Sequence, residues 1–101
     1  MAVIKRTKEC LKKFKSDFEK GLFSEGDGQV LKAWAREMEL FGPKYIAESS
    51  EWRDHPLDRE WSGYRASCFS VNGRIIYRII DERTIEVCEV ERITPAHNYK
   101  R

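Results

Sequence analysis

Residues 64–80 read YRASCFSVNGRIIYRII, and this stretch decides the fold. Two runs rich in β-branched and aromatic residues flank Asn72-Gly73, a dipeptide that two-residue hairpin turns prefer. The stretch therefore predicts two antiparallel strands, over 64–71 and 74–80, joined by a tight turn.

The expected turn also determines which side chains share a face of the hairpin. A turn on Asn72-Gly73 would place Val71 opposite Arg74 and Phe69 opposite Ile76. One face is then expected to be cationic and to meet a partner, since it carries Arg65, Arg74 and Arg78. The other face is more apolar and is expected to pack on helices, with Tyr64, Ala66, Cys68, Ile75, Tyr77 and Ile79.

Two amphipathic helices are expected before the hairpin, over 7–20 and 29–41. Their apolar residues recur every three or four positions, which is the period of one helix face. An N-cap at Ser24 or Asp27 and the helix breaker Gly42, followed by proline, bound the second helix. We expect a helical hairpin with one shared apolar face: Leu11, Phe14, Phe18 and Leu22 in the first helix, and Val30, Leu31, Trp34, Met38 and Phe41 in the second.

A third strand is expected over 84–93, after a turn at 81–83, because Pro95 cannot extend a sheet ladder. The 101 residues suffice for one hydrophobic core and are too few for two. The sequence therefore predicts a single α+β domain over 1–101, in which a two-helix hairpin packs on a small antiparallel sheet.

Composition narrows the function classes. No apolar run approaches the roughly 20 residues that a membrane helix needs, and no apolar signal core follows the first charges. We therefore expect a cytoplasmic protein. Cys10, Cys68 and Cys88 are too far apart for a disulfide framework or a zinc motif, and the two histidines are distant from one another. No metal ion or cofactor is expected.

The middle of the chain resembles a known family. DHPL at 54–57, WSGYR at 61–65 and RIIYR at 74–78 are similar to the central motifs of YafQ-type toxins in the RelE/ParE superfamily. DHPL followed by W-x-G-Y-R at this spacing is fairly specific, and the pattern at 91–92 and 97–99 resembles the closing strand and C-terminal residues of that group.

The resemblance implies a fold and a function. The fold would have the order β-α-α-β-β-β, with a first strand over about 2–6 joining a three-stranded antiparallel meander. The function would be that of a toxin that cleaves messenger RNA without a metal ion, usually in the ribosomal A site. A cognate antitoxin would be its protein partner, and mRNA and the 70S ribosome its other partners.

The resemblance also assigns site residues one by one. His55 matches the histidine of the DHPL element, and Arg74 lies where RelE-like toxins place a phosphate-binding arginine. Arg92 matches the basic residue that ends the last strand. His97 matches the C-terminal catalytic histidine, and Tyr99 matches a terminal tyrosine.

Three positions depart from the YafQ pattern. Cys68 stands where those toxins have histidine, Asn72 stands where they have an acidic residue, and one extra residue separates Arg92 from His97. These departures leave open which histidine is the acid and which the base.

The chemistry of metal-free RNA cleavage fits these residue types. The 2′-OH attacks the adjacent phosphate, so the site needs fixed cations, a proton acceptor and a proton donor. Arg74 and Arg92 would supply the cations, since arginine stays charged at neutral pH. His97 is the first candidate for proton transfer, because histidine titrates near neutrality. His55 would assist it or position the phosphate, and Tyr99 would stack on a base or donate a proton.

Each candidate also has an ordinary structural interpretation. Arg65 and Arg78, expected to bind RNA together with Lys100 and Arg101, are equally suited to salt bridges with nearby acidic residues. Further side chains are expected to serve packing: Trp34 in the core, Trp52 and Trp61 on the DHPL loop, and Cys68 and Cys88 at buried strand positions.

Two other functions compete with RNA cleavage. A ParE-like toxin on the same fold would inhibit DNA gyrase and hydrolyse nothing. A non-catalytic binding module would use the basic hairpin face only for docking on a protein or RNA.

Overall fold

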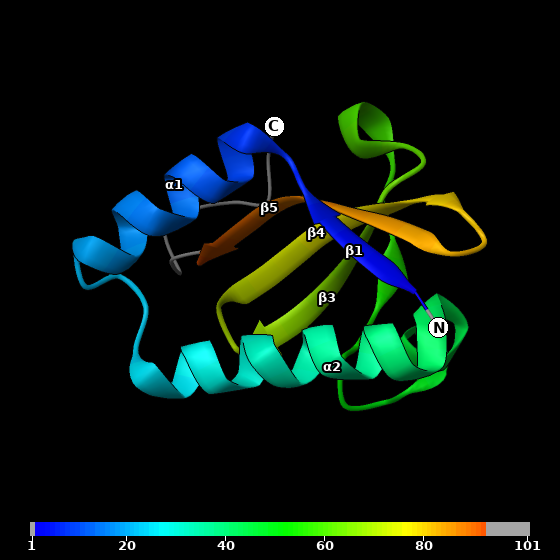
Figure 1. The fold of residues 1–101 in the computed structure, drawn as a ribbon, viewed down its shortest axis with the longest axis horizontal. Helices are drawn as coiled ribbons and strands as arrows, with labels where there is room; N and C mark the ends of the chain where they lie inside the picture. Colours follow the sequence, from blue (N-terminus) through cyan, green and yellow to red (C-terminus); the bar gives the residue numbers. More distant parts are fainter. Residues whose placement is uncertain (1, 93–101) are drawn as a thin grey trace.

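The computed structural model describes residues 2–92, except for the side chain of Arg92. In chain order, the elements are β1 (Val3–Arg6), α1 (Lys8–Glu19), α2 (Glu25–Glu48), β2 (His55–Pro56), a short 3-10 helix (Arg59–Trp61), β3 (Arg65–Ser70), β4 (Gly73–Asp81) and β5 (Thr84–Arg92) (Figure 1).

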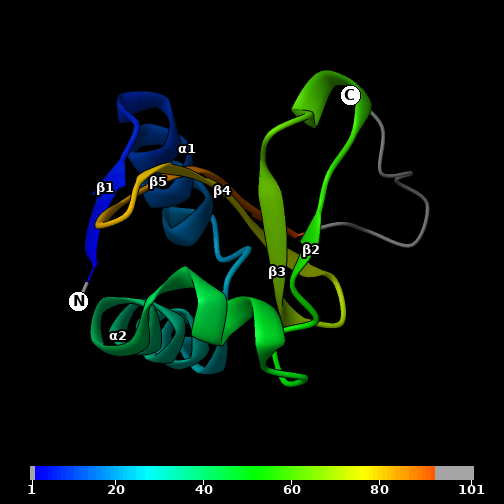
Figure 2. The ribbon, with the colours of Figure 1, turned by 90° about the vertical axis from the view of Figure 1, so that its right-hand side faces the viewer.

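The strands form one sheet in the order β1-β5-β4-β3-β2, which can be followed from side to side in Figure 2. Strand β1 runs parallel to β5, and the other neighbours are antiparallel, so the sheet is mixed rather than antiparallel as expected. The α+β class, the element order and the first strand are confirmed. The two-residue strand β2, which the sequence did not predict, adds to the edge beyond β3.

The β3–β4 hairpin turns one residue earlier than predicted. Ser70 pairs with Gly73, so Val71 and Asn72 form the turn. In the described chain, neither Asn72 nor Gly73 is among the residues with positive φ, which a type I′ turn on these two residues would require. Gly73 serves another purpose, because a Cβ there would lie 2.4 Å from the ring of Phe69.

The earlier turn alone would keep each side chain on its expected face, but the register also shifts between Cys68 and Ser70, and this irregularity overturns the expected faces of the hairpin. Cys68 pairs with Arg74, and Arg65 pairs with Tyr77. Because alternate residues of a strand point to opposite faces, Arg65 shares the face of Tyr77, whereas Cys68 shares the face of Arg74. The prediction that Arg65, Arg74 and Arg78 lie together was therefore wrong, as was the assignment of Ala66 and Cys68 to the packed face.

Helix α2 is longer than predicted at both ends. The Ser24 hydroxyl accepts the Asp27 N–H and the Asp27 carboxylate accepts the Ser24 N–H, each at 3.0 Å, so this capping box starts the helix at Glu25. Gly42, with φ 86° and ψ 174°, breaks the helix where expected. The chain then resumes helical geometry up to Glu48, because proline is tolerated in the first turn of a new helical segment.

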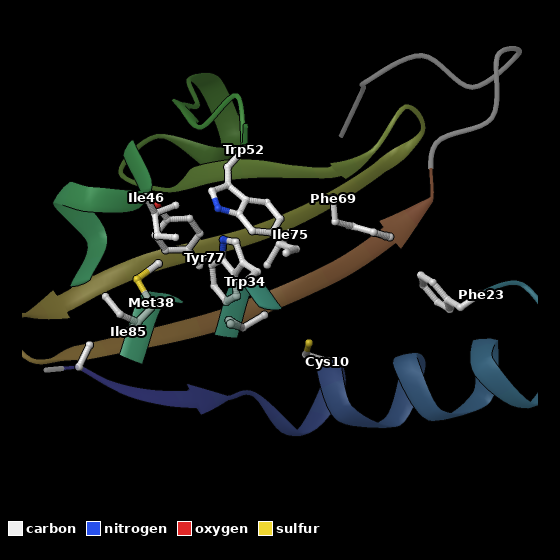
Figure 3. Close-up of a cluster of buried hydrophobic side chains, with 12 residues drawn as sticks. Cys10, Phe23, Trp34, Met38, Ile46, Trp52, Phe69, Ile75, Tyr77 and Ile85 are labelled. Carbon is white, nitrogen blue, oxygen red and sulfur yellow. The ribbon is translucent and has the colours of Figure 1, made fainter. Parts of the chain in front are cut away.

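The core lies between α2 and the central strands (Figure 3). Trp34 and Met38 of α2 meet Ile75 and Tyr77 of β4, and the rings of Trp34 and Tyr77 are 5.5 Å apart in an edge-to-face arrangement. Both α2 residues are at most 3% exposed, which confirms that Trp34 belongs to the core. Ile85 of β5 completes the same layer.

The apolar faces of the two helices do not pack fully against each other as expected. Cys10 is the buried residue of α1, whereas Leu11 is 51% exposed and Phe18 is 45% exposed. Of the apolar residues expected on α2, Phe41 is also exposed. Between α1 and α2 lies an open groove of about 550 Å³, whose floor includes Val90. No helix among the described residues is long and apolar enough to cross a membrane.

Candidate active site

Three chemically active side chains come from neighbouring strands on the sheet face opposite α2. His55 of β2 pairs with Ala66, and Cys68 of β3 pairs with Arg74 of β4. Directly paired residues share a face, and Cys68 is two positions from Ala66, so all three active side chains lie on one side of the sheet. We call this surface the His55–Cys68–Arg74 face.

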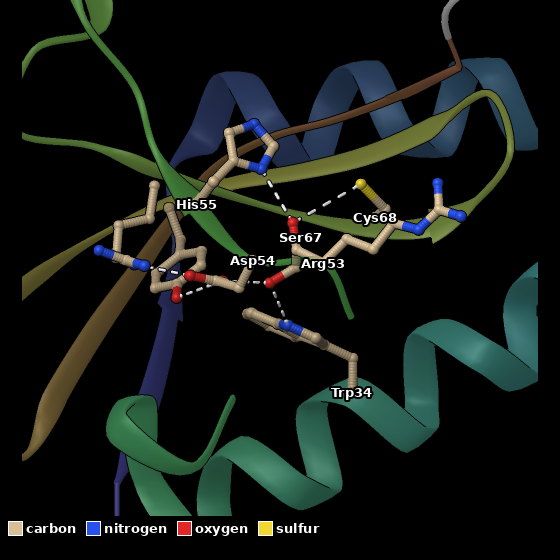
Figure 4. A network of polar contacts seen from close by, with 8 residues as sticks. Trp34, Arg53, Asp54, His55, Ser67 and Cys68 are labelled. Carbon is tan, nitrogen blue, oxygen red and sulfur yellow. Dashed lines mark hydrogen bonds and ion pairs between the residues drawn. The ribbon is translucent and has the colours of Figure 1, made fainter. Parts of the chain in front are cut away.

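The imidazole of His55 is held by the backbone. Its Nδ1 lies 2.9 Å from the carbonyl oxygen of Arg53. A carbonyl can only accept, so Nδ1 carries the hydrogen, and Nε2 of the neutral ring keeps its lone pair. Arg53 has a φ of 47°, an uncommon conformation for a residue with a side chain. The Cys68 sulfur also contacts this carbonyl, at 4.0 Å (Figure 4).

A buried carboxylate lies directly before His55. The Asp54 side chain is fully buried and accepts three hydrogen bonds, from Arg65 Nε at 2.6 Å, Ser67 Oγ at 2.6 Å and Tyr77 Oη at 2.7 Å. The Ser67 hydroxyl in turn accepts the indole N–H of Trp34 at 3.0 Å. Figure 4 shows this chain of contacts from α2 through β3 to Asp54. We call these five residues the Asp54 network.

The protonation states inside the network follow from burial and charge. Burial raises the pKa of Tyr77, and the neighbouring Asp54 carboxylate raises it further, so the phenol remains a donor. Burial opposes the charge on Arg65, but the hydrogen bond to Asp54 and its charge raise the pKa of the guanidinium. The network therefore holds one carboxylate balanced by one guanidinium.

Arg74 curls back along the hairpin turn. Its Nη1 donates to the Gly73 carbonyl at 2.9 Å and lies 3.5 Å from the Val71 carbonyl. The backbone of Arg92 on β5 pairs with Gly73, so the two arginines expected to flank the phosphate are on neighbouring strands. The Arg92 side chain and the candidates His97, Tyr99, Lys100 and Arg101 lie outside the described residues, and their roles stay predictions.

The two described candidates for RNA contact both have acidic partners. Arg65 forms the buried ion pair with Asp54, on the face covered by α2. Arg78 forms an exposed ion pair with Glu86 at 2.9 Å and lies over the ring of Tyr64, 5.8 Å from its centre. Both arginines thus form the salt bridges that were the alternative to RNA contact.

Of the remaining tryptophans, Trp52 supports the DHPL segment as expected, while Trp61 packs on Tyr64. Trp52 is 6% exposed and donates its indole N–H to Glu37 at 2.9 Å, which ties the segment to α2. Trp61 packs edge to face against Tyr64, with 5.1 Å between the ring centres. Neither ring is presented as a free platform for a base.

The cysteines differ from the expectation of burial in strands. Cys10 is the buried one, while Cys68 and Cys88 are half-buried. Burial and the nearby Glu86 carboxylate raise the pKa of Cys88 to about 11, which keeps it a thiol at neutral pH. Within residues 2–92, no three His, Cys, Asp or Glu side chains are grouped closely enough to hold a metal ion.

Solved structures of bacterial toxins share this fold. A copper-bound mutant toxin from Helicobacter pylori matches with a TM-score of 0.71 at 17% identity, over 91% of this chain and 94% of that one. YafQ in the Escherichia coli DinJ–YafQ complex gives 0.69 at 18% identity, over 91% and 93%. The chain has a RelE/ParE-like toxin fold.

A more distant match extends the same likeness. A chain of the Staphylococcus aureus YoeB–YefM complex gives a TM-score of 0.67 at 12% identity, over 93% of this chain and 99% of that one. No protein-family model and no curated protein sequence matches. The fold implied by the DHPL and W-x-G-Y-R motifs is therefore confirmed by structural likeness, while sequence identity stays low.

Sequence reasoning did not single out Asp54, which lies at the centre of the Asp54 network. It was noted only as the first letter of DHPL, although its carboxylate makes three of the shortest side-chain contacts in the described chain. The available signal was an acidic residue beside the candidate histidine, in a segment followed by Arg65 and Tyr77.

Proposed function

We propose that this chain is the toxin of a type II toxin–antitoxin pair and that it cleaves messenger RNA without a metal ion. One observation carries the proposal: His55 is held with Nδ1 on a backbone carbonyl, on the same sheet face as Arg74, and both side chains are half-buried. The likeness to YafQ and YoeB supports it. The C-terminal candidates His97 and Tyr99 are part of the proposal on the basis of the sequence resemblance.

The held imidazole restricts proton transfer to one atom. With Nδ1 engaged, a neutral His55 accepts a proton at Nε2, and a protonated His55 donates from the same atom. It would therefore either take the proton of the attacking 2′-OH or protonate the leaving 5′-oxygen, with His97 in the complementary role. Arg74 would stabilise the extra negative charge on the phosphate oxygens in the transition state.

We further propose that the ribosome presents the message, as the expected A-site action requires. Affinity for RNA alone comes largely from cations that neutralise phosphates. Arg65 and Arg78, the described candidates for this contact, are paired with Asp54 and Glu86. Arginines paired with carboxylates add little affinity for RNA. Such a site is suited to a message that the ribosome holds in place.

The proposed antitoxin would occupy the groove between α1 and α2. YafQ and YoeB were solved in complexes with DinJ and YefM, respectively. The groove of this chain has exposed apolar walls at Leu11 and Phe18, and its lining includes the basic residues Arg6 and Lys32 beside Glu25. These features fit an amphipathic segment whose apolar side faces the groove and whose rim carries acidic residues.

The test is to incubate the protein with translating ribosomes and map the 5′ ends of the message. We expect cuts at the A-site codon with wild-type protein and about 10²–10⁴-fold slower cutting with His55→Ala. Ribosomes need magnesium to stay assembled, so this part of the test uses crosslinked ribosomes. With these, cleavage should persist in excess EDTA. Intact message at equimolar protein would refute the proposal.

The ParE-like alternative shares the fold and is separated by a second assay. A gyrase inhibitor would leave the message intact and block DNA supercoiling. The non-catalytic alternative predicts neither RNA cuts nor loss of supercoiling, with binding retained in His55→Ala.

A further inference from the structure

The segment that carries His55 has little sheet structure of its own. Strand β2 contains two residues at the sheet edge, with the pairs His55–Ala66 and Pro56–Arg65. Backbone bonds on either side, from Cys68 N–H to the Trp52 carbonyl at 2.7 Å and from Leu57 N–H to the Tyr64 carbonyl at 2.9 Å, hold it along β3. They fix its course, but a short edge strand leaves its side chains weakly specified.

The hydrogen bonds of the Asp54 network fix the direction of the side chains in this segment. The carboxylate points to the α2 side of the sheet, where β3 and β4 offer it three donors. Successive residues of an extended segment point to opposite faces, so fixing Asp54 inward directs His55 outward. The same anchoring holds the Arg53 carbonyl, one residue earlier, against Nδ1 of His55.

We propose that Asp54 is a positioning residue for His55: its buried carboxylate anchors β2 so that the imidazole keeps hydrogen on Nδ1 and presents Nε2 to the RNA. The kinetic part of this inference rests on the proposed function, whereas the orientation of His55 does not. The charge of the Asp54 side chain matters as well as its shape, because Arg65 is its counter-ion. The Ser67 hydroxyl and the Tyr77 phenol also donate to this carboxylate and need it as an acceptor.

Asp54→Asn is the decisive variant. It keeps the shape of the side chain but removes the charge and replaces one acceptor with an N–H₂ group that faces a donor. Imidazole ¹⁵N shifts of selectively labelled His55 report the tautomer directly. We expect one Nδ1–H species in wild-type protein and a mixture of both tautomers in Asp54→Asn.

Ile85→Val is the matched control. Ile85 is fully buried in β5 and forms none of the hydrogen bonds of the Asp54 network, so trimming it lowers the stability of the core and leaves those bonds in place. We expect this variant to unfold at a lower temperature and to keep the single tautomer. If Asp54→Asn does not fold, Tyr77→Phe removes one of the three donors and keeps the ring, and a smaller shift toward the second tautomer is expected.

Kinetics separate positioning from general stability. Asp54→Asn should lower kcat about 10²-fold, as misplacement of a reacting group by about 1 Å does, and leave KM within about twofold. In a His55→Ala background it should cause no further loss, because Asp54 acts through His55.

The outcomes are distinct. A single unchanged tautomer in Asp54→Asn, or in Tyr77→Phe should the first variant not fold, overturns the inference. So does a full additional loss of kcat in the His55→Ala background. If wild-type protein cuts no RNA, the proposed function fails, and the tautomer measurement still decides whether Asp54 orients His55.

Discussion

The ring of Phe69 on β3 packs directly on Gly73 of β4, so closely that a methyl group at Gly73 would lie 2.4 Å from Cζ of the ring. Phe69 is 5% exposed and meets Phe23 with 6.1 Å between ring centres, so it has little room to move. This contact fills the space at the start of β4 and leaves no room for a side chain at Gly73.

Gly73→Ala is therefore expected to lower the free energy of unfolding by about 1–3 kcal/mol, the usual cost of overpacking. For a domain of this size the melting temperature should fall by about 5 °C or more. Gly28→Ala is the matched control, because its Cβ would lie 3.9 Å from Phe18 in a helix that prefers alanine. Equal melting temperatures for the two variants would contradict the role given to the Phe69 contact.

Arg74→Ala should slow RNA cleavage about 10²–10³-fold, since removing one group that stabilises transition-state charge has this effect. Arg74→Lys should recover part of the rate, as lysine keeps the charge but not the planar fork. Single-turnover cleavage on ribosomes would measure both. Arg83→Ala, at the exposed β4–β5 turn, is the control for a general loss of positive charge, and a similar loss there would remove the case for Arg74.

Stability should decrease at alkaline pH, in part because of Cys88. Burial and Glu86 raise the pKa of this thiol from 9.0 to about 11. The unfolded chain therefore loses the proton first, and the stability present below pH 9 is lost as the pH rises toward 11. Urea unfolding across this range should show a shallower decline for Cys88→Ala. The pKa of Tyr77 is also raised in the folded protein, so ionisation of Tyr77 in the unfolded chain lowers the stability of both proteins above pH 10. Parallel profiles would show that Cys88 does not contribute.

Leu11→Glu should weaken binding of an acidic amphipathic antitoxin segment at least tenfold, with little change in stability. Leu11 is 51% exposed in the wall of the α1–α2 groove, so the substitution removes apolar contact area and places a negative charge beside the segment. Titration calorimetry with the cognate antitoxin would measure the change. Val71→Glu, at a position 89% exposed on the hairpin turn, is the control. Similar affinities for the two variants would exclude the groove as the docking site.

Local signals predicted the elements because each is determined mainly by neighbours in sequence. The Asn-Gly hairpin, the 3.6-residue periodicity and the N-cap expected at Ser24 or Asp27 are all of this kind. The register of β3 and β4 was not predictable in this way, since it includes an irregularity between Cys68 and Ser70, where the Phe69 ring packs on Gly73. A preference for turn residues identified the hairpin correctly and placed it one residue too late.

Periodicity likewise identified α1 as amphipathic without showing what covers it. Cys10 is buried, whereas Leu11 and Phe18, which line the groove with it, are exposed. The sequence alone cannot distinguish an apolar stripe that packs in the domain from one that is left for a partner, because both have the same spacing.

The candidate site was predicted in part. The resemblance selected His55 and Arg74, and the fold brings them to one face with Cys68. Asp54 escaped notice because its donors are 11, 13 and 23 residues further along the chain. A pattern of neighbouring residues carries no information about contacts at that separation.

The pairing of β1 with β5 has a consequence for synthesis. Val3 leaves the ribosome early, but its partner Thr84 emerges only after both helices and the hairpin have been translated. Until then, β1 has no neighbour in the sheet and α1 has no strand beneath it. Assembly of this domain therefore waits for its last strand, and a chain interrupted before β5 leaves β1 without its partner in the sheet.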